Sequence, residues 1–407
     1  MARILRTFQA LTRRYPRIRY LRLGPERVYL LSHPELVHQV FVRNGRAVKK
    51  GRTSDGIKAV LGEGLLTSEG ELHRRQRRLI QPSLHAERIE SYRELIERTA
   101  SDWSTSWTPG RSVDITREMS ALTLTVISRM LFGRSLTRED IDQVADCLEP
   151  MLGGRPWQML PGANVLLSLP LPAIRHRFEA AERLRALTQR LIDERSGGMV
   201  NAFEQLSEEQ RRDEAVTLLL AGHETTATAL SWTWLLLSEH PAVARRLLES
   251  GEDGSPDPAW VHAVFAESLR LFPPSWILAR RPVEDLKVDD CTLPAGSLAV
   301  ACTWALQRDP RFWPDAEAFR PERWLADDTF SPTAPGVPKG AWLPFGIGSR
   351  ACVGEDFAWL EGTTVLDQLV RTWRPVLDSA ARGKVRARPG TTLRPAAALP
   401  MTLHPAA

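Results

Sequence analysis

Cysteine is scarce in this chain of 407 residues, which contains only Cys147, Cys291, Cys302 and Cys352. Four scattered cysteines are too few for a disulfide framework, and none of them forms a CxxC zinc motif. Long apolar runs are missing too, since no stretch approaches the roughly 20 apolar residues that a membrane span needs. The first residues lack the apolar core and the cleavage site of a signal peptide. We therefore expect a soluble, cytoplasmic protein with no integral membrane anchor.

Lysine accounts for only 6 of the 54 basic residues, and 49 acidic residues leave a formal net charge of only +5. The sequence also lacks basic patches interleaved with aromatic residues, so we expect no nucleic-acid partner. Hydrophobic residues make up 43% and charged residues 25%, as in ordinary soluble globular proteins. With no internal repeat, low-complexity tract or long flexible linker, we expect one domain over residues 1–407.

The hydrophobic pattern predicts a mainly α protein with a minor β portion. Apolar residues recur at three and four positions from residue 71 to about residue 195, and a longer apolar helix is predicted over 208–238. Shorter helices are expected over 34–41, 243–248 and 260–271, and a last one after Cys352. Strand-like runs occupy 18–32, 286–288, 297–302 and 392–399.

The sharpest local motif is PFGIGSRACVG at residues 344–354, directly before the predicted last helix. Its glycines allow a tight loop against something flat and bulky, and Cys352 would sit at the amino end of the helix. Free N–H groups and the helix dipole there stabilise a thiolate, which is a good axial ligand for haem iron. The alternative is a buried structural cysteine in a glycine-rich turn.

A second motif, AGHETT at residues 221–226, lies in the middle of the long predicted helix. A threonine hydroxyl can bond back to a carbonyl three or four residues earlier, and Gly222 removes side-chain bulk, so we expect a notch in the helix. An acid beside an alcohol, here Glu224 beside Thr225, can relay protons into a dry pocket. A solvated polar patch is the alternative.

Two further motifs place charges on helix faces. Glu267 and Arg270 are three residues apart, so they lie side by side, which alone indicates only a common surface ion pair. The densest basic cluster, HRRQRR at residues 73–78, places His73 and Arg77 on one face. A solvated helix face is the alternative for this cluster.

Together these motifs resemble the cytochrome P450 family of haem-thiolate enzymes. The cysteine segment matches the family pattern FxxGxRxCxG in every fixed position, and residues 221–225 match AGxET. The early β element, the basic helix, the long helix, ExxR, PERW and the cysteine loop follow in the family's order over nearly the whole chain. The resemblance implies the cytochrome P450 fold and a haem b (iron protoporphyrin IX), whose iron binds Cys352 as its metal ligand.

The resemblance also implies roles for single residues. The haem propionates are expected to bind His73, Arg77, Arg280 and Arg350. Contacts to the rest of the haem are expected from Ala221, Gly222, Phe345, Gly346 and Gly354. Arg323, in FRPERW at residues 319–324, is expected to join Glu267 and Arg270 in a buried structural triad. His223 is expected to line the site without binding iron. The connection after residue 195 is short, so the helices before the long one are expected to be abbreviated.

The implied activity is a monooxygenase of secondary metabolism that uses dioxygen as co-substrate. Electrons would come ultimately from NAD(P)H through a ferredoxin reductase and a ferredoxin, which is expected to dock near the exposed Arg74, Arg75 and Arg78. Glu224 and Thr225 would supply protons to the reaction.

The substrate pocket, by family position, comprises residues 151–165 and Leu218, Pro274, Trp276, Ile277 and Leu399. This apolar set favours a hydrophobic small molecule, which is a terpenoid, a polyketide or an aromatic amino-acid derivative. Two alternatives stay open: a haem-thiolate enzyme of the same fold that performs oxidative coupling or peroxide-driven oxidation, and a non-catalytic haem-binding sensor.

Overall fold

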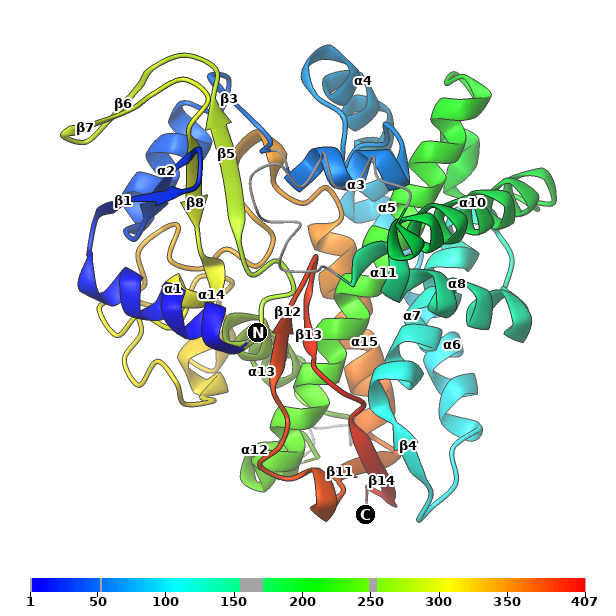
Figure 1. Cartoon of the computed structure of the whole chain (residues 1–407). Coiled ribbons are helices and arrows are strands. Elements are labelled where there is room, and N and C mark those ends of the chain that lie inside the picture. The colour runs from blue at the N-terminus through cyan, green and yellow to red at the C-terminus, as the bar shows by residue number, and fades with distance from the viewer. Residues whose placement is uncertain (1, 52, 154–170, 249–254, 407) are drawn as a thin grey trace.

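The computed structural model of the chain describes residues 2–51, 53–153, 171–248 and 255–406. Helices form most of the molecule, and a β-rich part that contains the N-terminal strands lies along one side of them (Figure 1). The predicted class, mainly α with minor β, is therefore confirmed. Among the described residues, no helix is both long enough and apolar enough to span a bilayer.

The largest sheet has five strands in the order β1-β2-β8-β5-β3. The strands are β1 (Ile18–Leu23), β2 (Glu26–Leu31), β8 (Leu298–Ala301), β5 (Leu278–Pro282) and β3 (Val48–Lys49). β2 pairs with β8 in parallel and the other neighbours are antiparallel. The predicted strands over 18–32 and 297–302 are confirmed, and the predicted strand over 286–288 forms a hairpin of β6 (Leu286–Val288) with β7 (Cys291–Leu293).

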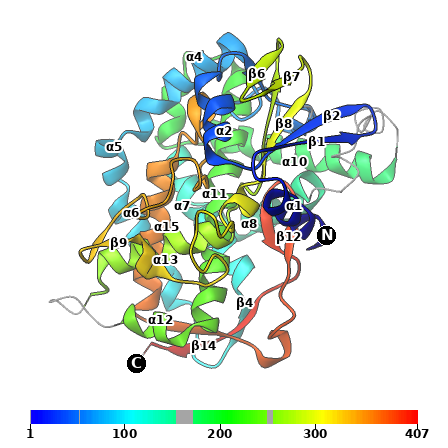
Figure 2. The same cartoon turned by 90° about the vertical axis from the view of Figure 1, so that its left-hand side faces the viewer.

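The long helix α11 (Glu208–Glu239) runs through the middle of the helical part beside α15 (Glu355–Val370), as both views show (Figures 1 and 2). Ser207 caps it by accepting a hydrogen bond from the backbone N–H of Gln210. The helix is buried on almost every side along its second half, as expected for an apolar helix in the core of a large domain.

Helix α7 (Ile115–Phe132) packs along α11, and Gly222 is the reason the two can approach closely. A Cβ atom at Gly222 would lie 2.7 Å from the Cδ1 of Ile127. The expected notch is wrong, because α11 continues as an α-helix across residues 221–226. Gly222 therefore serves the contact between α7 and α11.

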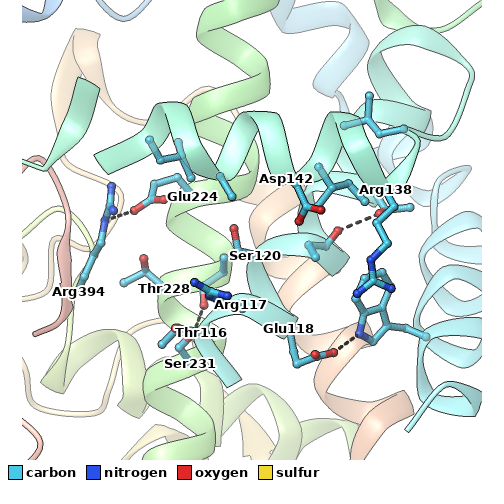
Figure 3. Close-up of a pocket in the computed structure, with 18 of the residues that line it drawn as sticks. Thr116, Arg117, Glu118, Ser120, Arg138, Asp142, Glu224, Thr228, Ser231 and Arg394 are labelled. Atoms are coloured by element: carbon cyan, nitrogen blue, oxygen red, sulfur yellow. Dashed lines mark hydrogen bonds and ion pairs between the residues drawn. The ribbon is translucent and has the colours of Figure 1, made fainter. Parts of the chain in front are cut away.

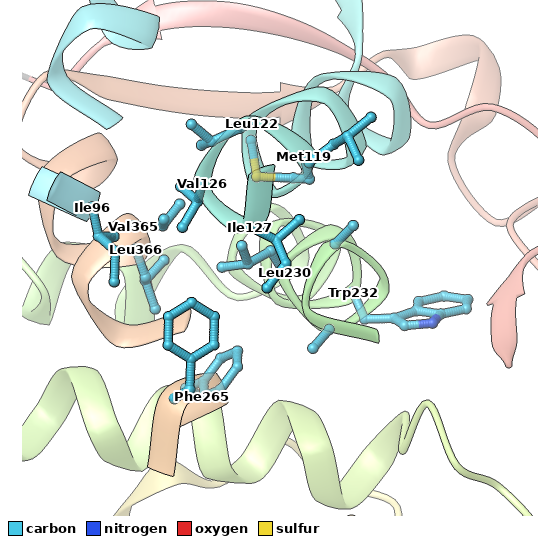
Figure 4. Close-up of a cluster of buried hydrophobic side chains, with 14 of the residues drawn as sticks. Ile96, Met119, Leu122, Val126, Ile127, Leu230, Trp232, Phe265, Val365 and Leu366 are labelled. Carbon is cyan, nitrogen blue, oxygen red and sulfur yellow. The ribbon is translucent and has the colours of Figure 1, made fainter. Parts of the chain in front are cut away.

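The main hydrophobic core lies where α7, α11, α13 (Pro258–Leu271) and α15 meet (Figure 4). Ile127 and Leu230 face one another between α7 and α11, while Val365 and Phe265 fill the space toward α15 and α13. Trp232 of α11 stacks on Phe272 with 4.0 Å between the ring centroids. This packing fixes the helices that hold the functional residues.

Most of the other helices lie in the predicted stretches with shifted ends, but those over 2–14, 53–61 and 303–306 were not predicted. These other helices are α1 (Ala2–Arg14), α2 (Pro34–His38), α3 (Thr53–Leu61), α4 (Gly70–Ile80), α5 (Ala86–Glu90), α6 (Arg93–Thr105), α8 (Arg138–Leu152), α10 (Pro172–Asp193), α12 (Pro241–Arg246) and α14 (Thr303–Leu306). A π-helical turn, η1 (Gln39–Arg43), extends α2. Among the described helices before α11, α8 has 15 residues and α10 has 22, and a 3₁₀ turn at Met199–Phe203 lies in the short connection. Whether these helices are abbreviated stays a prediction, since residues 154–170 lie outside the described residues.

The C-terminal strands differ most from the prediction. The predicted strand over 392–399 is only three residues long, β13 (Leu393–Pro395), and it pairs with β12 (Ala387–Pro389). A second sheet of three strands joins β11 (Trp373–Leu377), β14 (Pro400–Pro405) and β4 (Ser112–Asp114). The chain therefore leaves one sheet and enters another between residues 395 and 400.

Candidate active site

The cysteine loop is a tight turn held against the N-terminal part of the chain. Gly346 and Gly348 adopt positive φ values of 72° and 77°, a region that favours glycine. A Cβ atom at Gly348 would lie 2.3 Å from the carbonyl oxygen of Phe41 in η1, so this position requires glycine. The backbone N–H of Cys352 donates to the carbonyl oxygen of Phe345 over 2.8 Å, which closes the loop.

The thiol of Cys352 is accessible to solvent, although protein atoms crowd around it on the other sides. Burial raises its pKa to about 11, and a hydrogen bond from the backbone N–H of Gly354 offsets only part of that increase. Helix α15 begins three residues later, at Glu355, so Cys352 does not lie in its first turn. The helix end alone therefore does not offset the effect of burial on the thiol, and a bound metal ion would favour its deprotonation.

Five cationic or basic side chains gather beside the loop, four of them predicted: His73, Arg77, Arg280 and Arg350, with Lys50 as the fifth. Arg77 donates to the carbonyl oxygen of Ala351 over 2.9 Å, next to the cysteine. Arg350 donates to the carbonyl oxygen of Ser68 over 2.8 Å and forms an ion pair with Glu69. The structure thus brings these predicted residues together.

The positive charges of this basic cluster are buried and repel one another. Burial, reinforced by the positive charge of Arg350, lowers the pKa of His73 to about 3 and that of Lys50 to about 7. Burial and the charge of Arg350 also lower the pKa of Arg280 to about 10. Glu69 supplies opposite charge to Lys50, Arg280 and Arg350, but a single carboxylate cannot neutralise the cluster. A bound dianion would remove this mutual repulsion.

On the central helix, the two predicted catalytic residues make separate contacts. The hydroxyl of Thr225 donates to the carbonyl oxygen of Ala221 over 2.8 Å, as expected of a threonine in a helix. The carboxylate of Glu224 is buried, accepts a 2.8 Å hydrogen bond from Thr392 and forms a 2.6 Å ion pair with Arg394. His223 is fully buried, with its Nδ1 2.8 Å from the carbonyl oxygen of Leu219.

The predicted triad forms in the interior. Glu267 and Arg270 are both 0% exposed and make two hydrogen bonds of 2.7 and 2.8 Å. Arg323 donates to Oε1 of the same carboxylate over 3.0 Å, and the indole N–H of Trp324 donates to Oε2 over 2.9 Å. Burial alone would raise the pKa of Glu267, but the two arginines hold it below its usual value. Arg270 also binds the carbonyl oxygens of the chain segment at residues 307–318.

Several predicted pocket residues belong to the protein core instead. Trp276 is 1% exposed, packs near Leu5 and donates its indole N–H to the carbonyl oxygen of Gly390. Leu399 is 0% exposed in the main core, and Pro274 is buried. Leu218 and Ile277 remain partly accessible, whereas residues 154–165 of the predicted 151–165 segment lie outside the described residues. Tryptophan and leucine at these positions therefore stabilise the fold.

Sequence reasoning missed Lys50, Glu361 and the partners of Glu224. Glu361, on α15, is fully buried, and burial raises its pKa to about 8 even though the nearby Thr226 hydroxyl opposes the rise. Nothing local marks these residues as functional, since they become neighbours of the site only through the fold. Ala221, expected to contact haem, is exposed although the residues that follow it in α11 are mostly buried.

The geometry fits a haem bound through a cysteine. A Cβ atom at Gly354 would meet no atom within 4 Å, so there is room beside the loop for a bulky group. The accessible Cys352 can bind iron, and the basic cluster can bind two propionates. Fold and site together define a haem-thiolate protein.

Comparison with known proteins agrees with a haem-thiolate protein. The cytochrome P450 family profile matches residues 2–395, and the chain belongs to this family. It is 36% identical to cyclooctatin synthase of Streptomyces melanosporofaciens over 95% of this chain and 86% of that protein. It is 35% identical to cyclooctat-9-en-7-ol 5-monooxygenase of the same organism (92% and 83%) and 30% identical to pentalenene oxygenase of Streptomyces avermitilis (89% and 84%).

Solved structures show the same likeness. The crystal structure of CYP175A1 from one strain of Thermus thermophilus superposes with a TM-score of 0.82 at 32% identity, covering 98% of this chain and 95% of that one. A 6-coordinated cytochrome P450 from another strain of the same species gives 0.79 at 31% identity, with coverage of 99% and 98%. The protein is therefore a cytochrome P450 monooxygenase, an oxidoreductase that uses haem iron and dioxygen.

Proposed function

We propose that the enzyme hydroxylates a C–H bond of a terpenoid, with electrons from NAD(P)H delivered by a ferredoxin reductase and a ferredoxin. The observation that carries the substrate class is the likeness to three bacterial enzymes over about nine-tenths of the chain, two of which have names that refer to cyclooctatin compounds and one to pentalenene. The accessible residues Leu218 and Ala221 of α11 are apolar, which agrees with a hydrophobic substrate.

Each residue has a definite task in this proposal. Haem iron, when bound, supplies the reductive activation of dioxygen and the transfer of one oxygen atom to the substrate, while the other leaves as water. Cys352 holds the iron, and the basic cluster of Lys50, His73, Arg77, Arg280 and Arg350 holds the propionates. Thr225 positions a proton donor on the accessible face of α11, and Glu224 passes protons to it from the solvent side.

A spectroscopic panel tests the substrate class. Purified holoenzyme is titrated with cyclic terpenoids, macrolactone polyketides and aromatic amino-acid derivatives, and displacement of the water on the iron is followed through the Soret shift. We expect the tightest binding and the largest shift for a terpenoid with few polar groups. A stronger response to either of the other classes would contradict the proposed substrate.

Product analysis separates the proposed reaction from the other activities. With NADH, reductase and ferredoxin we expect a product that gains one oxygen atom from ¹⁸O₂, at a rate well above that with hydrogen peroxide alone. A dimer without added oxygen would indicate oxidative coupling. Preferential use of peroxide would indicate a peroxide-driven oxidation, and haem binding without any product would indicate a sensor.

Thr225→Ala should uncouple electron use from product formation. The variant removes the hydroxyl bonded to the Ala221 carbonyl oxygen but leaves the rest of the site in place, so haem content and substrate affinity should stay close to the parent values. Product formed per NADH should fall about tenfold, since general acid catalysis contributes roughly 10²–10⁴-fold to such steps. Thr226→Ala, one residue along the helix, is the control, and equal coupling in parent and T225A would remove Thr225 from proton delivery.

Charge reversal on α4 should slow reduction by the ferredoxin. Arg77 of α4 contacts the cysteine loop, and Arg74, Arg75 and Arg78 of the same helix are exposed. An acidic ferredoxin would be attracted to them, and this attraction weakens as salt shortens the Debye length to about 8–10 Å. Arg74→Glu/Arg78→Glu should slow ferredoxin-driven reduction about tenfold at low salt and leave dithionite reduction unchanged.

The matched control is Arg3→Glu/Arg6→Glu on α1, which changes charge equally but lies on a helix that packs against α14 and β12. Its reduction rate should equal that of the parent. If the α4 variant keeps the parent rate at every ionic strength, the partner does not dock on this helix.

A further inference from the structure

A second feature of the central helix is a polar cleft of about 1240 Å³ between α6, α7, α8, α11 and the β12–β13 hairpin (Figure 3). Helix α11 contributes Glu224, Thr228 and Ser231 to its wall, a stripe at four- and three-residue spacing. Leu218, Ala221 and Thr225 lie on a neighbouring stripe of the same helix and do not line the cleft. Of the two predicted catalytic residues, Glu224 thus lines the cleft and Thr225 does not.

The cleft can hold water, because hydroxyl, carboxylate and guanidinium groups form about half of its lining. Thr116, Ser120 and Asp142 are among these groups, and Figure 3 shows them around the same space as Glu224. Glu224 is the acid of the AGHETT segment that a proton arriving through the cleft could reach. That carboxylate is already engaged through one oxygen, because Thr392 and Arg394 both bind Oε1.

Arg394 lies between two carboxylates. Its Nε is 2.6 Å from Oε1 of Glu224, while its Nη1 is 3.8 Å from Oε2 of Glu149 on α8. Its Nη2 is buried with no hydrogen-bond partner among the described residues, which is an unfavourable state for a charged donor. The Nε of Arg394 also donates to the Thr392 hydroxyl over 3.1 Å, so Nε is well bound whereas Nη1 has a loose contact and Nη2 has none. A side-chain rotation toward Glu149 would improve the contacts of Nη1 and Nη2.

Glu149 is suited to receive that guanidinium. Arg388 and Arg394 are directly opposite in the β12–β13 hairpin, and Arg388 already donates to Oε2 of Glu149 over 2.6 Å. Two like charges at opposed positions destabilise a hairpin unless an anion lies between them. Glu149 is 60% exposed, against 8% for Glu224, so the chain of ion pairs leads from solvent to the buried acid.

The hairpin itself is fixed, so the motion is confined to side chains. The indole N–H of Trp232 donates to the carbonyl oxygen of Leu393, and that of Trp276 to the carbonyl oxygen of Gly390. The N–H of Leu393 donates to the carbonyl oxygen of Pro274. Three long-range hydrogen bonds thus hold the backbone beside Arg394.

We propose that Arg394 is a positioning residue that controls proton entry from the cleft by exchanging its guanidinium between Glu224 and Glu149. With Arg394 on Glu224, the acid is occupied; with Arg394 on Glu149, the acid can take a proton from cleft water and pass it toward Thr225. This inference rests on the proposed role of Glu224 in proton delivery.

The test compares Glu149→Gln in two backgrounds. Substrate-free holoenzyme is supplied with NADH, reductase and a [2Fe–2S] ferredoxin, and water formation is measured as NADH oxidised without release of hydrogen peroxide. Glu149→Gln removes the negative charge that attracts the guanidinium away from Glu224 and should lower water formation about fivefold in the parent. In the Arg394→Gln background no guanidinium is left to exchange, so Glu149→Gln should change water formation by less than about 1.5-fold. Arg386→Gln, which loses a nearby arginine bonded only to local carbonyl oxygens, should match the parent.

Equal losses in both backgrounds, or no loss in either, would overturn the exchange.

A second measurement does not depend on turnover: urea unfolding of ferric Glu224→Gln, Arg394→Gln and the double variant. The midpoint shift of the double variant should be smaller than the sum of the single shifts. Additive shifts would overturn the proposal. Absence of NADH oxidation by the parent would instead refute the proposed ferredoxin dependence, and the unfolding cycle would still decide the inference.

Discussion

Arg270→Ala should yield little folded holoprotein. The substitution leaves the buried carboxylate of Glu267 without its two strongest hydrogen bonds and releases three carbonyl oxygens at residues 307, 316 and 318. Breaking a buried ion pair by removing one member costs about 3–5 kcal/mol. That is a large part of the roughly 5–15 kcal/mol by which a typical domain is stable. Yield, haem content and the urea midpoint of the soluble fraction measure the effect.

Arg98→Ala is the control for this prediction, because Arg98 forms an ion pair with Glu94 on an exposed helix face where both side chains are 73% exposed. Its loss should cost less than about 1 kcal/mol. Arg270→Lys keeps a charge but cannot reproduce the forked set of hydrogen bonds. Its yield and urea midpoint should therefore lie between those of Arg270→Ala and Arg98→Ala. Parent-like yield and midpoint for R270A would show that the buried triad contributes little to folding.

Cys352→Ala should abolish monooxygenation altogether. Among the described residues beside the loop, none could replace the sulfur, because the neighbouring basic cluster consists of cations and a neutral histidine whose pKa is lowered to about 3. Loss of thiolate donation should leave product formation from dioxygen at background, a fall of at least about a thousandfold. Product from NADH, ferredoxin and dioxygen is the measurement.

Cys291→Ala is the matched control, since Cys291 lies in the β6–β7 hairpin, remote in sequence from the loop, and is partly exposed. It should retain parent activity. Cys352→His is informative as well, because imidazole can hold haem iron without thiolate donation, so this variant should keep haem and lose product. Substantial activity in either Cys352 variant would mean that another group binds the iron.

The cysteine loop and the pair of Glu267 and Arg270 could be predicted because their residues follow fixed local spacings, whereas Arg323 was predicted from the resemblance to the family. Gly346 and Gly348 supply the positive φ values of the loop, and the ExxR spacing puts Glu267 beside Arg270 in any helix. The periodicity that predicted α11 was equally local, and its cap at Ser207 and end before Pro241 agree with it. Such features depend on a few consecutive residues and need no knowledge of the whole fold.

The pocket residues and the partners of Glu224 could not be predicted in the same way. Trp276 is apolar and follows the expected position, but its indole turns into the core to bind Gly390, which lies 114 residues later. Arg394 and Glu149 meet Glu224 only because three separate elements converge, and each alone is an ordinary surface charge in the sequence. The pKa of Cys352 likewise depends on burial by the whole domain rather than on its place before a helix.

The measurement that tests the haem-thiolate account most directly is the absorption spectrum of the reduced carbon monoxide complex of the unmodified protein, prepared under gentle reduction. Thiolate ligation by Cys352 pushes electron density onto the iron and should give the strongly red-shifted Soret band, with one haem per chain. A Soret band at the position typical of imidazole-ligated haem, from protein that has not been denatured, would contradict the account.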